Sequence, residues 1–151
     1  MLDSIDRAIL RRLQADPGLS LPDLADVVGV TPTRVGRRLE RLTDAGVIKG
    51  QVATVDWAAF GYPLRVSLRI TLDKTARDGF DVFLAAARLV PEVLEIQTFL
   101  GRVDVRLAVV ARDLSHYQDV YRRRILALPH IADIEALMNV AVVKSDDRLP
   151  L

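Results

Sequence analysis

The first fifty residues carry the apolar spacing of three short helices. Leu2, Ile5, Ile9 and Leu13 recur every three or four residues, which puts them on one face of a helix. The run Asp-Pro-Gly at residues 16–18 ends this helix. The predicted helices span about residues 2–15, 21–28 and 32–45.

The second and third of these helices are joined by a short turn. Ser20 is a suitable N-cap for the second helix, and Gly29 supplies a left-handed exit from it. Thr31 and Pro32 then begin the third helix, since threonine caps a helix and proline suits its first position. Gly46 ends it. This arrangement predicts a helix-turn-helix.

The segment after Gly46 is short, β-branched and interrupted by Gly50. Residues 47–55 therefore predict a small hairpin, or wing, that leads into an extended linker. We place the domain boundaries accordingly. They are a helix-turn-helix domain over 1–50, a wing or linker strand over 51–61, a second domain over 62–145 and a tail over 146–151.

The second domain alternates strand-like and helix-like segments. Between Leu64 and Leu72 apolar and polar residues alternate strictly, as in a half-buried strand. A weak repeat places Pro91 and Pro129 at equivalent points between a helix and a strand. Strands are predicted over 64–72, 93–100, 103–110 and 133–144, and helices over 77–89 and 114–126. The order βαββαβ predicts a ferredoxin-like sheet and an α+β fold.

The predicted strand after Pro91 is apolar on both faces. Leu94, Ile96 and Leu100 fall on one side, while Val93 and Phe99 fall on the other. Helices cover only one face of such a sheet, so we expect the other face to pack on a second subunit. We therefore predict a dimer or a larger assembly.

Charge is distributed unevenly along the chain. The net charge is only +1, yet residues 31–50 hold five basic and two acidic side chains, a local charge of +3. Residues 51–151 hold thirteen of each sign. A basic segment beside a neutral domain suits a protein that grips phosphate with one part and assembles through the other.

Arginines gather on one face of the third helix. At about 100° per residue, Arg34, Arg37, Arg38 and Arg41 share an arc, and Val35, Leu39 and Leu42 form a separate apolar face. Arginine can fork to guanine edges or to phosphates, and the first turn of a recognition helix meets the bases. A solvated charged face is the alternative. The predicted DNA contacts are Thr31, Thr33, Arg34, Arg37, Arg38, Arg41 and Lys49, the last three on phosphates.

Three stretches resemble one family of transcription regulators. They are residues 2–10, LDSIDRAIL, residues 28–39, VGVTPTRVGRRL, and residues 46–48, GVI. They are similar to the leucine-responsive and asparagine-responsive (Lrp/AsnC, feast/famine) regulators. The second half of the chain also resembles the βαββαβ sensing domain of that family. The resemblance implies dimers, often octamers, that bind palindromic double-stranded DNA and respond to amino acids or related small molecules lodged between subunits.

The resemblance also implies an effector site. In the family a glycine in the loop between the second and third strands is followed three residues later by an aspartate, which corresponds to Gly101 and Asp104. Thr98 and Leu114 match pocket-lining positions. Arg102 and Val105 depart from the family pattern, in which these positions are often acidic and aromatic. The alternatives are a tight hairpin turn at Gly101 and, at Asp104, a surface carboxylate paired with Arg102 or Arg106.

Other functional classes fit the sequence poorly. With no cysteine, two histidines and no acidic cluster at ligand spacing, we expect neither an enzyme, a metal site nor a cofactor. His116, Tyr117 and Asp119 are neighbours on a helix and do not converge. No segment is apolar enough to span a bilayer, so we expect a cytoplasmic protein with no membrane partner.

We therefore predict a sequence-specific DNA-binding transcriptional regulator whose oligomeric second domain responds to a small molecule. Two alternatives fit the same residues. One is an architectural protein that coats DNA with little sequence preference. The other is a metabolite-binding assembly protein whose helical domain does not bind DNA.

Overall fold

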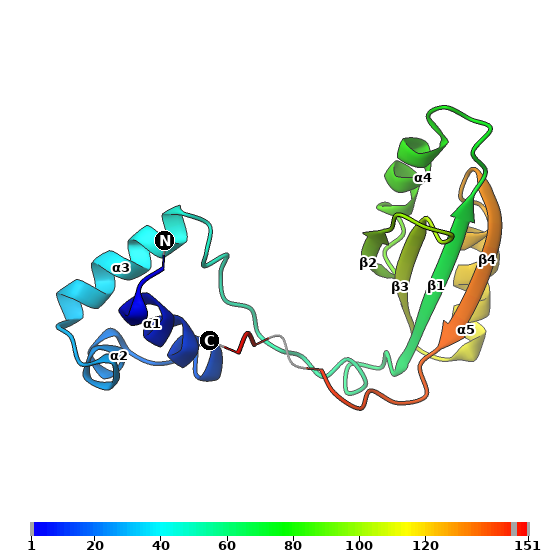
Figure 1. Cartoon of the computed structure of the whole chain (residues 1–151). Coiled ribbons are helices and arrows are strands. Elements are labelled where there is room, and N and C mark those ends of the chain that lie inside the picture. The colour runs from blue at the N-terminus through cyan, green and yellow to red at the C-terminus, as the bar shows by residue number, and fades with distance from the viewer. Residues whose placement is uncertain (1, 146–147, 151) are drawn as a thin grey trace. The chain divides into compact units, whose positions relative to one another are not determined.

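Two units make up the chain in the computed structural model, which describes residues 2–145 and 148–150 (Figure 1). The first unit comprises Met1–Thr54 with Lys144–Leu151, and the second comprises Val55–Val143. The boundary lies inside the segment predicted as a wing or linker. Of the predicted tail over 146–151, residues 146, 147 and 151 lie outside the described residues, as does Met1.

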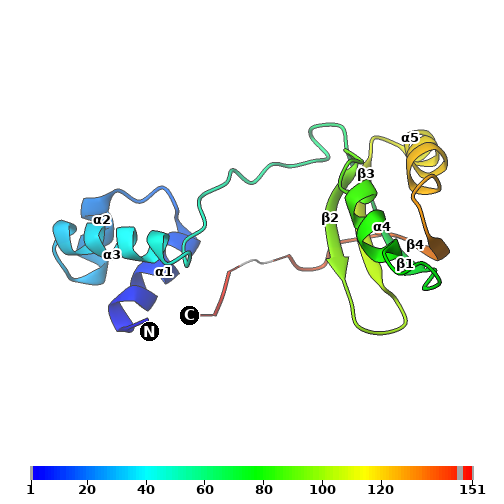
Figure 2. The same cartoon turned by 90° about the horizontal axis from the view of Figure 1, so that it is seen from above.

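The first unit holds the three predicted helices (Figure 2). Helix α1 spans Ser4–Ala15, α2 spans Leu21–Val28 and α3 spans Pro32–Asp44. Asp3 caps α1 through a reciprocal capping box with Asp6, and the Ser20 hydroxyl accepts the backbone N–H of Asp23. Gly29 has a φ of 75°, the left-handed conformation that glycine adopts without strain, so α2 can turn directly into α3.

Apolar side chains from all three helices meet in one core. Ile9, Leu24, Ala25 and Val35 are buried there, and partly buried residues such as Leu39 pack around them. The apolar face predicted for the third helix is thus confirmed, and the opposite face of α3 remains available to solvent.

The hairpin expected over residues 47–55 is not formed. These residues contain no strand, and residues 57–61 form a turn. The backbone N–H groups of Val47 and Ile48 instead donate to the Leu42 carbonyl at 2.9 and 3.1 Å, which ends α3. An isolated two-stranded hairpin is marginally stable at best in water, so a β-branched sequence alone does not ensure that one forms. The prediction of strands in this segment was wrong.

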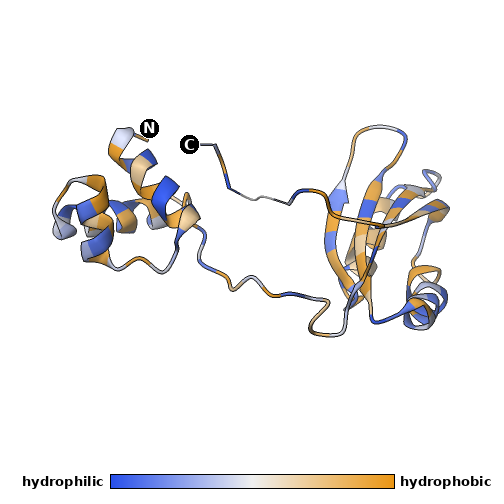
Figure 3. Ribbon diagram, turned by 90° about the horizontal axis from the view of Figure 1, so that it is seen from below, coloured by the Kyte–Doolittle hydropathy of each residue, from blue (hydrophilic) through white to orange (hydrophobic). Residues whose placement is uncertain are grey.

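The second unit is a four-stranded antiparallel sheet with helices on one face. Its strands lie in the order β2-β3-β1-β4, which is the ferredoxin-like βαββαβ arrangement predicted. Alternating apolar and polar residues along the strands are visible in Figure 3. The elements are β1 Leu64–Leu72, α4 Gly79–Ala87, β2 Val93–Thr98, β3 Val105–Ala111, α5 Leu114–Val120, a π-helical continuation η1 Tyr121–Ile125, and β4 Ile131–Met138.

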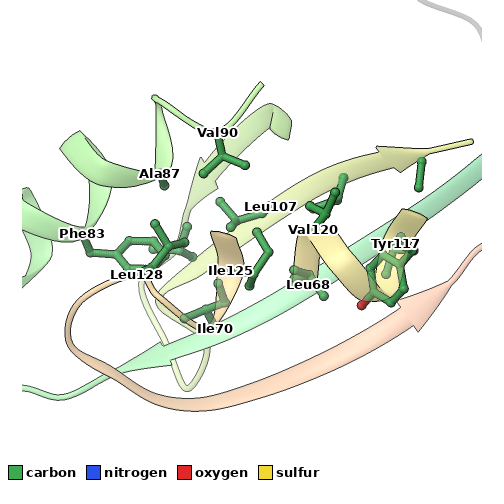
Figure 4. Packing of buried hydrophobic residues seen from close by; sticks show 14 of the residues in the cluster. Leu68, Ile70, Phe83, Ala87, Val90, Leu107, Tyr117, Val120, Ile125 and Leu128 are labelled. Carbon is green, nitrogen blue, oxygen red and sulfur yellow. The ribbon is translucent and has the colours of Figure 1, made fainter. Parts of the chain in front are cut away.

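The core lies between this sheet and its helices. Leu68 and Ile70 of β1 and Leu107 of β3 are fully buried, and Phe83 of α4 and Ile125 of η1 cover them (Figure 4). Fully burying side chains of this size contributes roughly 1.5–3 kcal/mol each relative to exposure. The helix-covered face is therefore fixed by the strict alternation of β1.

Two expectations about this unit need correction. The last strand ends at Met138 and not at residue 144. A bulge at β2 pairs Val93 with Val109 and Glu95 with Ala108, so Leu94 is the extra residue. Val93 and Ile96 consequently pack on the same core, and Leu94 lies half-exposed.

The uncovered face of the sheet carries more charge than expected. Gln97, Arg106, Arg69 and Glu135 lie opposite one another in a row across the strands. Arg106 pairs with Glu95 at 3.0 Å, and Arg69 pairs with Glu135 at 3.3 Å. The expectation of strands that are apolar on both faces thus holds only near Leu94.

Candidate nucleic-acid interface

Helix α3 presents four arginines around one hollow. Arg34, Arg37, Arg38 and Arg41 line a pocket of about 270 Å³ on its solvent face. Spacings of three and four residues place them on adjacent turns, as the sequence predicted. The face is strongly basic, so its environment decides which of these charges can reach a ligand.

Two of the arginines are held by the first helix. Arg38 Nη1 donates to both carboxylate oxygens of Asp3 at 2.8 and 2.6 Å and to Asp6 Oδ1 at 2.7 Å. Arg41 Nη2 donates to both oxygens of Asp6 at 2.6 Å. The Asp6 side chain is fully buried and that of Arg38 is 16% exposed. This Asp3–Asp6–Arg38–Arg41 cluster joins α1 to α3.

Hydrogen bonds hold both carboxylates in the ionised form. The backbone N–H of Asp6, followed by the Arg38 guanidinium, lowers the pKa of Asp3 to about 2. Burial raises the pKa of Asp6, but hydrogen bonds from Arg38, the Asp3 backbone and Arg41 outweigh it and leave that pKa lowered. The same partners raise the pKa of Arg38. The cluster is therefore fully charged at neutral pH.

The other two arginines have a different environment. Arg34 and Arg37 are exposed, and neither forms a side-chain hydrogen bond or ion pair with any residue in the ranges 2–145 and 148–150. Both lie in the first half of α3. Their guanidinium groups are therefore available to a partner outside the chain.

The remaining predicted contacts lie at either end of α3. Thr31 occupies the N-cap position, but its side chain makes no capping hydrogen bond, contrary to the role expected for it. Thr33 is exposed in the first turn. Lys49 is exposed beyond the bend that ends α3, in irregular backbone and not on a wing strand. Thr31 and Thr33 thus both precede Arg34 at the start of the helix.

The second candidate site lies at one end of the sheet. Asp104 precedes β3, and its side chain is 13% exposed. Its Oδ2 accepts the backbone N–H of Leu72 at 2.8 Å, and Oδ1 lies 3.4 Å from Lys74 Nζ. Asp104 pairs with Lys74 and not with Arg102 or Arg106, the partners expected if it were a surface carboxylate. A pocket of about 280 Å³ beside it is lined by Leu72, Asp73, Lys74, Ala76, Arg77, Phe80 and Asp104.

The four predicted effector residues do not meet within one chain. Thr98 ends β2 and Gly101 lies in the following loop, so both are near the start of β3, as Asp104 is. Leu114 follows the other end of β3 and is 54% exposed. The 7 residues of β3 separate Asp104 from Leu114, which corresponds to roughly 20 Å along the strand. Gly101 has a φ of 154°, a conformation that residues with a side chain rarely adopt, so the loop backbone by itself also favours glycine here.

Comparison with known proteins assigns the two units. Residues 2–49 match the family model described as winged helix-turn-helix DNA-binding, and residues 65–149 match the Lrp/AsnC ligand binding domain. The chain belongs to the Lrp/AsnC family. This Lrp/AsnC chain is a DNA-binding transcriptional regulator with an effector-binding C-terminal domain, and its family is not one of enzymes.

Relatives of this Lrp/AsnC regulator match over nearly their whole length. The DNA-binding transcriptional activator DecR of Escherichia coli K12 is 32% identical over 100% of this chain and 99% of its own. The leucine-responsive regulatory protein of Salmonella typhimurium is 34% identical over 98% and 90%. The Neisseria meningitidis regulator NMB0573, solved in complex with L-Met, superposes with a TM-score of 0.92 at 26% identity over 99% and 97% of the chains.

Two further observations bear on this regulator's chemistry. No helix among the described residues is long and apolar enough to cross a membrane. Within the same residues, no group of three or more histidine or acidic side chains could hold a metal ion.

The sequence did not predict the part played by Asp3 and Asp6, whose arginine partners lie more than thirty positions away along the chain. The only available signal was a pair of acidic residues at the start of α1 facing an excess of arginine in α3.

Proposed function

We propose that Arg34 and Arg37 contact base edges in the DNA major groove and that Thr31, Thr33 and Lys49 contact the adjoining phosphates. The observation that carries this is the contrast on α3, where Arg34 and Arg37 are exposed without partners among the described residues. Arginine without an internal partner can fork to guanine O6 and N7.

Arg38 and Arg41 leave the set of direct contacts in this proposal. Arg38 donates through Nη1 to the carboxylates of Asp3 and Asp6, and Arg41 donates through Nη2 to that of Asp6. A guanidinium that is already neutralised by a carboxylate gains little from a phosphate, because breaking the pair would leave the buried Asp6 uncompensated. Their role is to join α3 to α1.

The test measures binding of purified protein to the DNA upstream of its own gene. Arg34→Ala and Arg37→Ala should each weaken specific binding by about 1–3 kcal/mol, the value of one bidentate base contact. Arg12→Ala on α1 removes an equally exposed charge outside this face and is the control. Unchanged affinity in both α3 variants would reject the proposed contacts.

We further propose that the effector is an amino acid or a related small molecule bound at the Gly101 end of the sheet. The solved complex of NMB0573 with L-Met supports this ligand class. Thr98, Gly101 and Asp104 share that end, and Leu114 can join them only from a second copy of the chain. The proposal therefore includes self-association, as dimers or octamers, and action in the cytoplasm, where the regulated DNA is.

Thermal unfolding of the full chain with each amino acid in turn tests the effector proposal. A bound effector at a hundred times its Kd should stabilise the protein by about 2.7 kcal/mol. The response should be lost in Leu114→Asp, which puts a charge at the position expected from the second copy. A panel without any stabilisation would reject an amino-acid effector.

A further inference from the structure

The ion cluster between α1 and α3 is electrically balanced. Asp3 and Asp6 carry two negative charges, and Arg38 and Arg41 carry two positive ones. The contacts are short, between 2.6 and 2.8 Å, and the Asp6 carboxylate is fully buried. Charges paired this closely present almost no net field to a ligand at the distance of the DNA backbone.

This balance changes what the recognition face offers to DNA. The affinity of a protein for any duplex rises with the number of phosphates it neutralises, since each releases condensed counterions. Four unpaired arginines on one helix would bind every sequence strongly. With Arg38 and Arg41 neutralised, only Arg34 and Arg37 of this face remain as uncompensated charges.

We propose that Asp3 and Asp6 are specificity-determining residues of the regulator: by neutralising Arg38 and Arg41 they suppress sequence-independent phosphate binding and leave base reading to Arg34 and Arg37. The inference rests on the proposed DNA contacts of α3. The two acids touch no DNA themselves, so they are positioning residues that act through the arginines.

A purely structural clamp would look different in experiment. Loss of a clamp lowers stability and weakens binding to all DNA, whereas release of paired arginines strengthens non-specific binding. The slope of log affinity against log salt concentration separates the two, because it counts phosphates neutralised and changes by about 0.9 for each. A folding defect cannot steepen that slope.

The variants Asp3→Asn and Asp6→Asn test the proposal. Asparagine keeps the size and an acceptor oxygen, and it caps helices as well as aspartate does, so α1 keeps its start. Asp3 is half-exposed, which makes Asp3→Asn the variant that folds even if Asp6→Asn does not. The control is Asp44→Asn, which adds the same charge to α3 at its exposed last residue, outside the cluster.

Fluorescence anisotropy with a random-sequence duplex over a range of KCl concentrations gives the slope for each full-length protein. We expect Asp3→Asn and Asp6→Asn to bind this duplex more tightly and to steepen the slope by about one for each bound head, with Asp44→Asn changing it by less than half as much. An unchanged slope in the variants that fold, or an equal change in Asp44→Asn, would overturn the inference.

Failure of this inference is distinguishable from failure of the proposed contacts. If Arg37→Ala weakens specific binding but the aspartate variants keep the wild-type slope, only the role of Asp3 and Asp6 is rejected. If Arg34→Ala and Arg37→Ala both bind as wild type does, the contacts themselves are rejected, whatever the slopes show.

Discussion

The carboxylate of Asp104 accepts the backbone N–H of Leu72 at 2.8 Å, which fastens the start of β3 to the end of β1. Leu72 is buried, and the Asp104 side chain is only 13% exposed. The aspartate that we propose as an effector contact thus already has a structural partner in this chain. Its Oδ1 also lies 3.4 Å from Lys74 Nζ, so a neighbouring cation already partly neutralises this carboxylate.

Replacement of Asp104 by alanine should destabilise the second unit. The change leaves the buried N–H of Leu72 without its acceptor, and an unsatisfied buried donor costs about 1–3 kcal/mol. Urea unfolding of the full chain measures the effect. Asp104→Asn retains an acceptor and should lose less. Equal stability of Asp104→Ala and wild type would show that the bond contributes nothing.

The first unit should lose stability in acid. The pKa of Asp3 falls from its ordinary 3.8 to about 2 on folding, and that of Asp6 is also lowered. The unfolded chain therefore takes up protons first, so this stabilisation is complete above about pH 4 and is lost as the pH falls toward 2. Thermal unfolding followed at fixed ionic strength should show the loss, and Asp3→Asn should reduce it. A variant with the wild-type pH profile would contradict the assignment.

Self-association should depend on the exposed apolar residues near Leu94. Val55, Trp57, Phe60, Tyr62, Leu94 and Val110 help to line a pocket of about 370 Å³ at this edge of the sheet's uncovered face. Arg65 stacks over Trp57 at 4.0 Å, which orders the start of this surface. Leu94→Glu should shift the mass measured by light scattering toward the 16.8 kDa of one chain.

Leu89 supplies the control for that experiment. It is 81% exposed just after α4, away from the uncovered face of the sheet, so Leu89→Glu adds the same charge elsewhere. Its mass should equal that of the wild type. An assembled Leu94→Glu protein, or a dissociated Leu89→Glu protein, would show that the interface lies on another surface.

Two glycines should respond to alanine in opposite directions. A Cβ at Gly36, inside α3, would lie 3.7 Å from Leu21 Cδ2, an ordinary contact. Gly36→Ala should therefore stabilise the first unit by about 0.5–1 kcal/mol. Gly101 has a φ of 154° and open space around it, so Gly101→Ala should cost about 1–3 kcal/mol through backbone strain alone. Two thermal unfolding curves measure both changes, and a stabilised Gly101→Ala protein would contradict the second.

The sequence predicted what local spacing determines. The three helices of the first unit and the alternation of β1 follow from side chains a few positions apart, and both are observed. The bulge at Leu94 depends on pairing between β2 and β3, and the hairpin expected over residues 47–55 did not form because no strand pairs there. Periodicity alone carries no information about such partners.

The candidate site divides in the same way. Helical spacing predicted the arginine face of α3. It did not predict that Arg38 pairs with Asp3 and Asp6 while Arg37 remains unpaired among the described residues. The two adjacent arginines differ because Arg38 contacts Asp6, which lies 32 positions away along the chain. Such a pairing depends on how α1 packs against α3, and a helical spacing pattern does not contain it.

Because the chain contains no cysteine, a single introduced thiol can report where α3 meets DNA. Thr33→Cys and Thr43→Cys each introduce one thiol at an exposed threonine of α3, at the start and near the end of the helix. Labelling of each thiol by a maleimide is timed with and without DNA. We expect DNA to slow labelling at position 33 severalfold and to leave labelling at position 43 unchanged. Equal protection at both positions, or none at position 33, would contradict the claim that the first half of α3 meets the DNA.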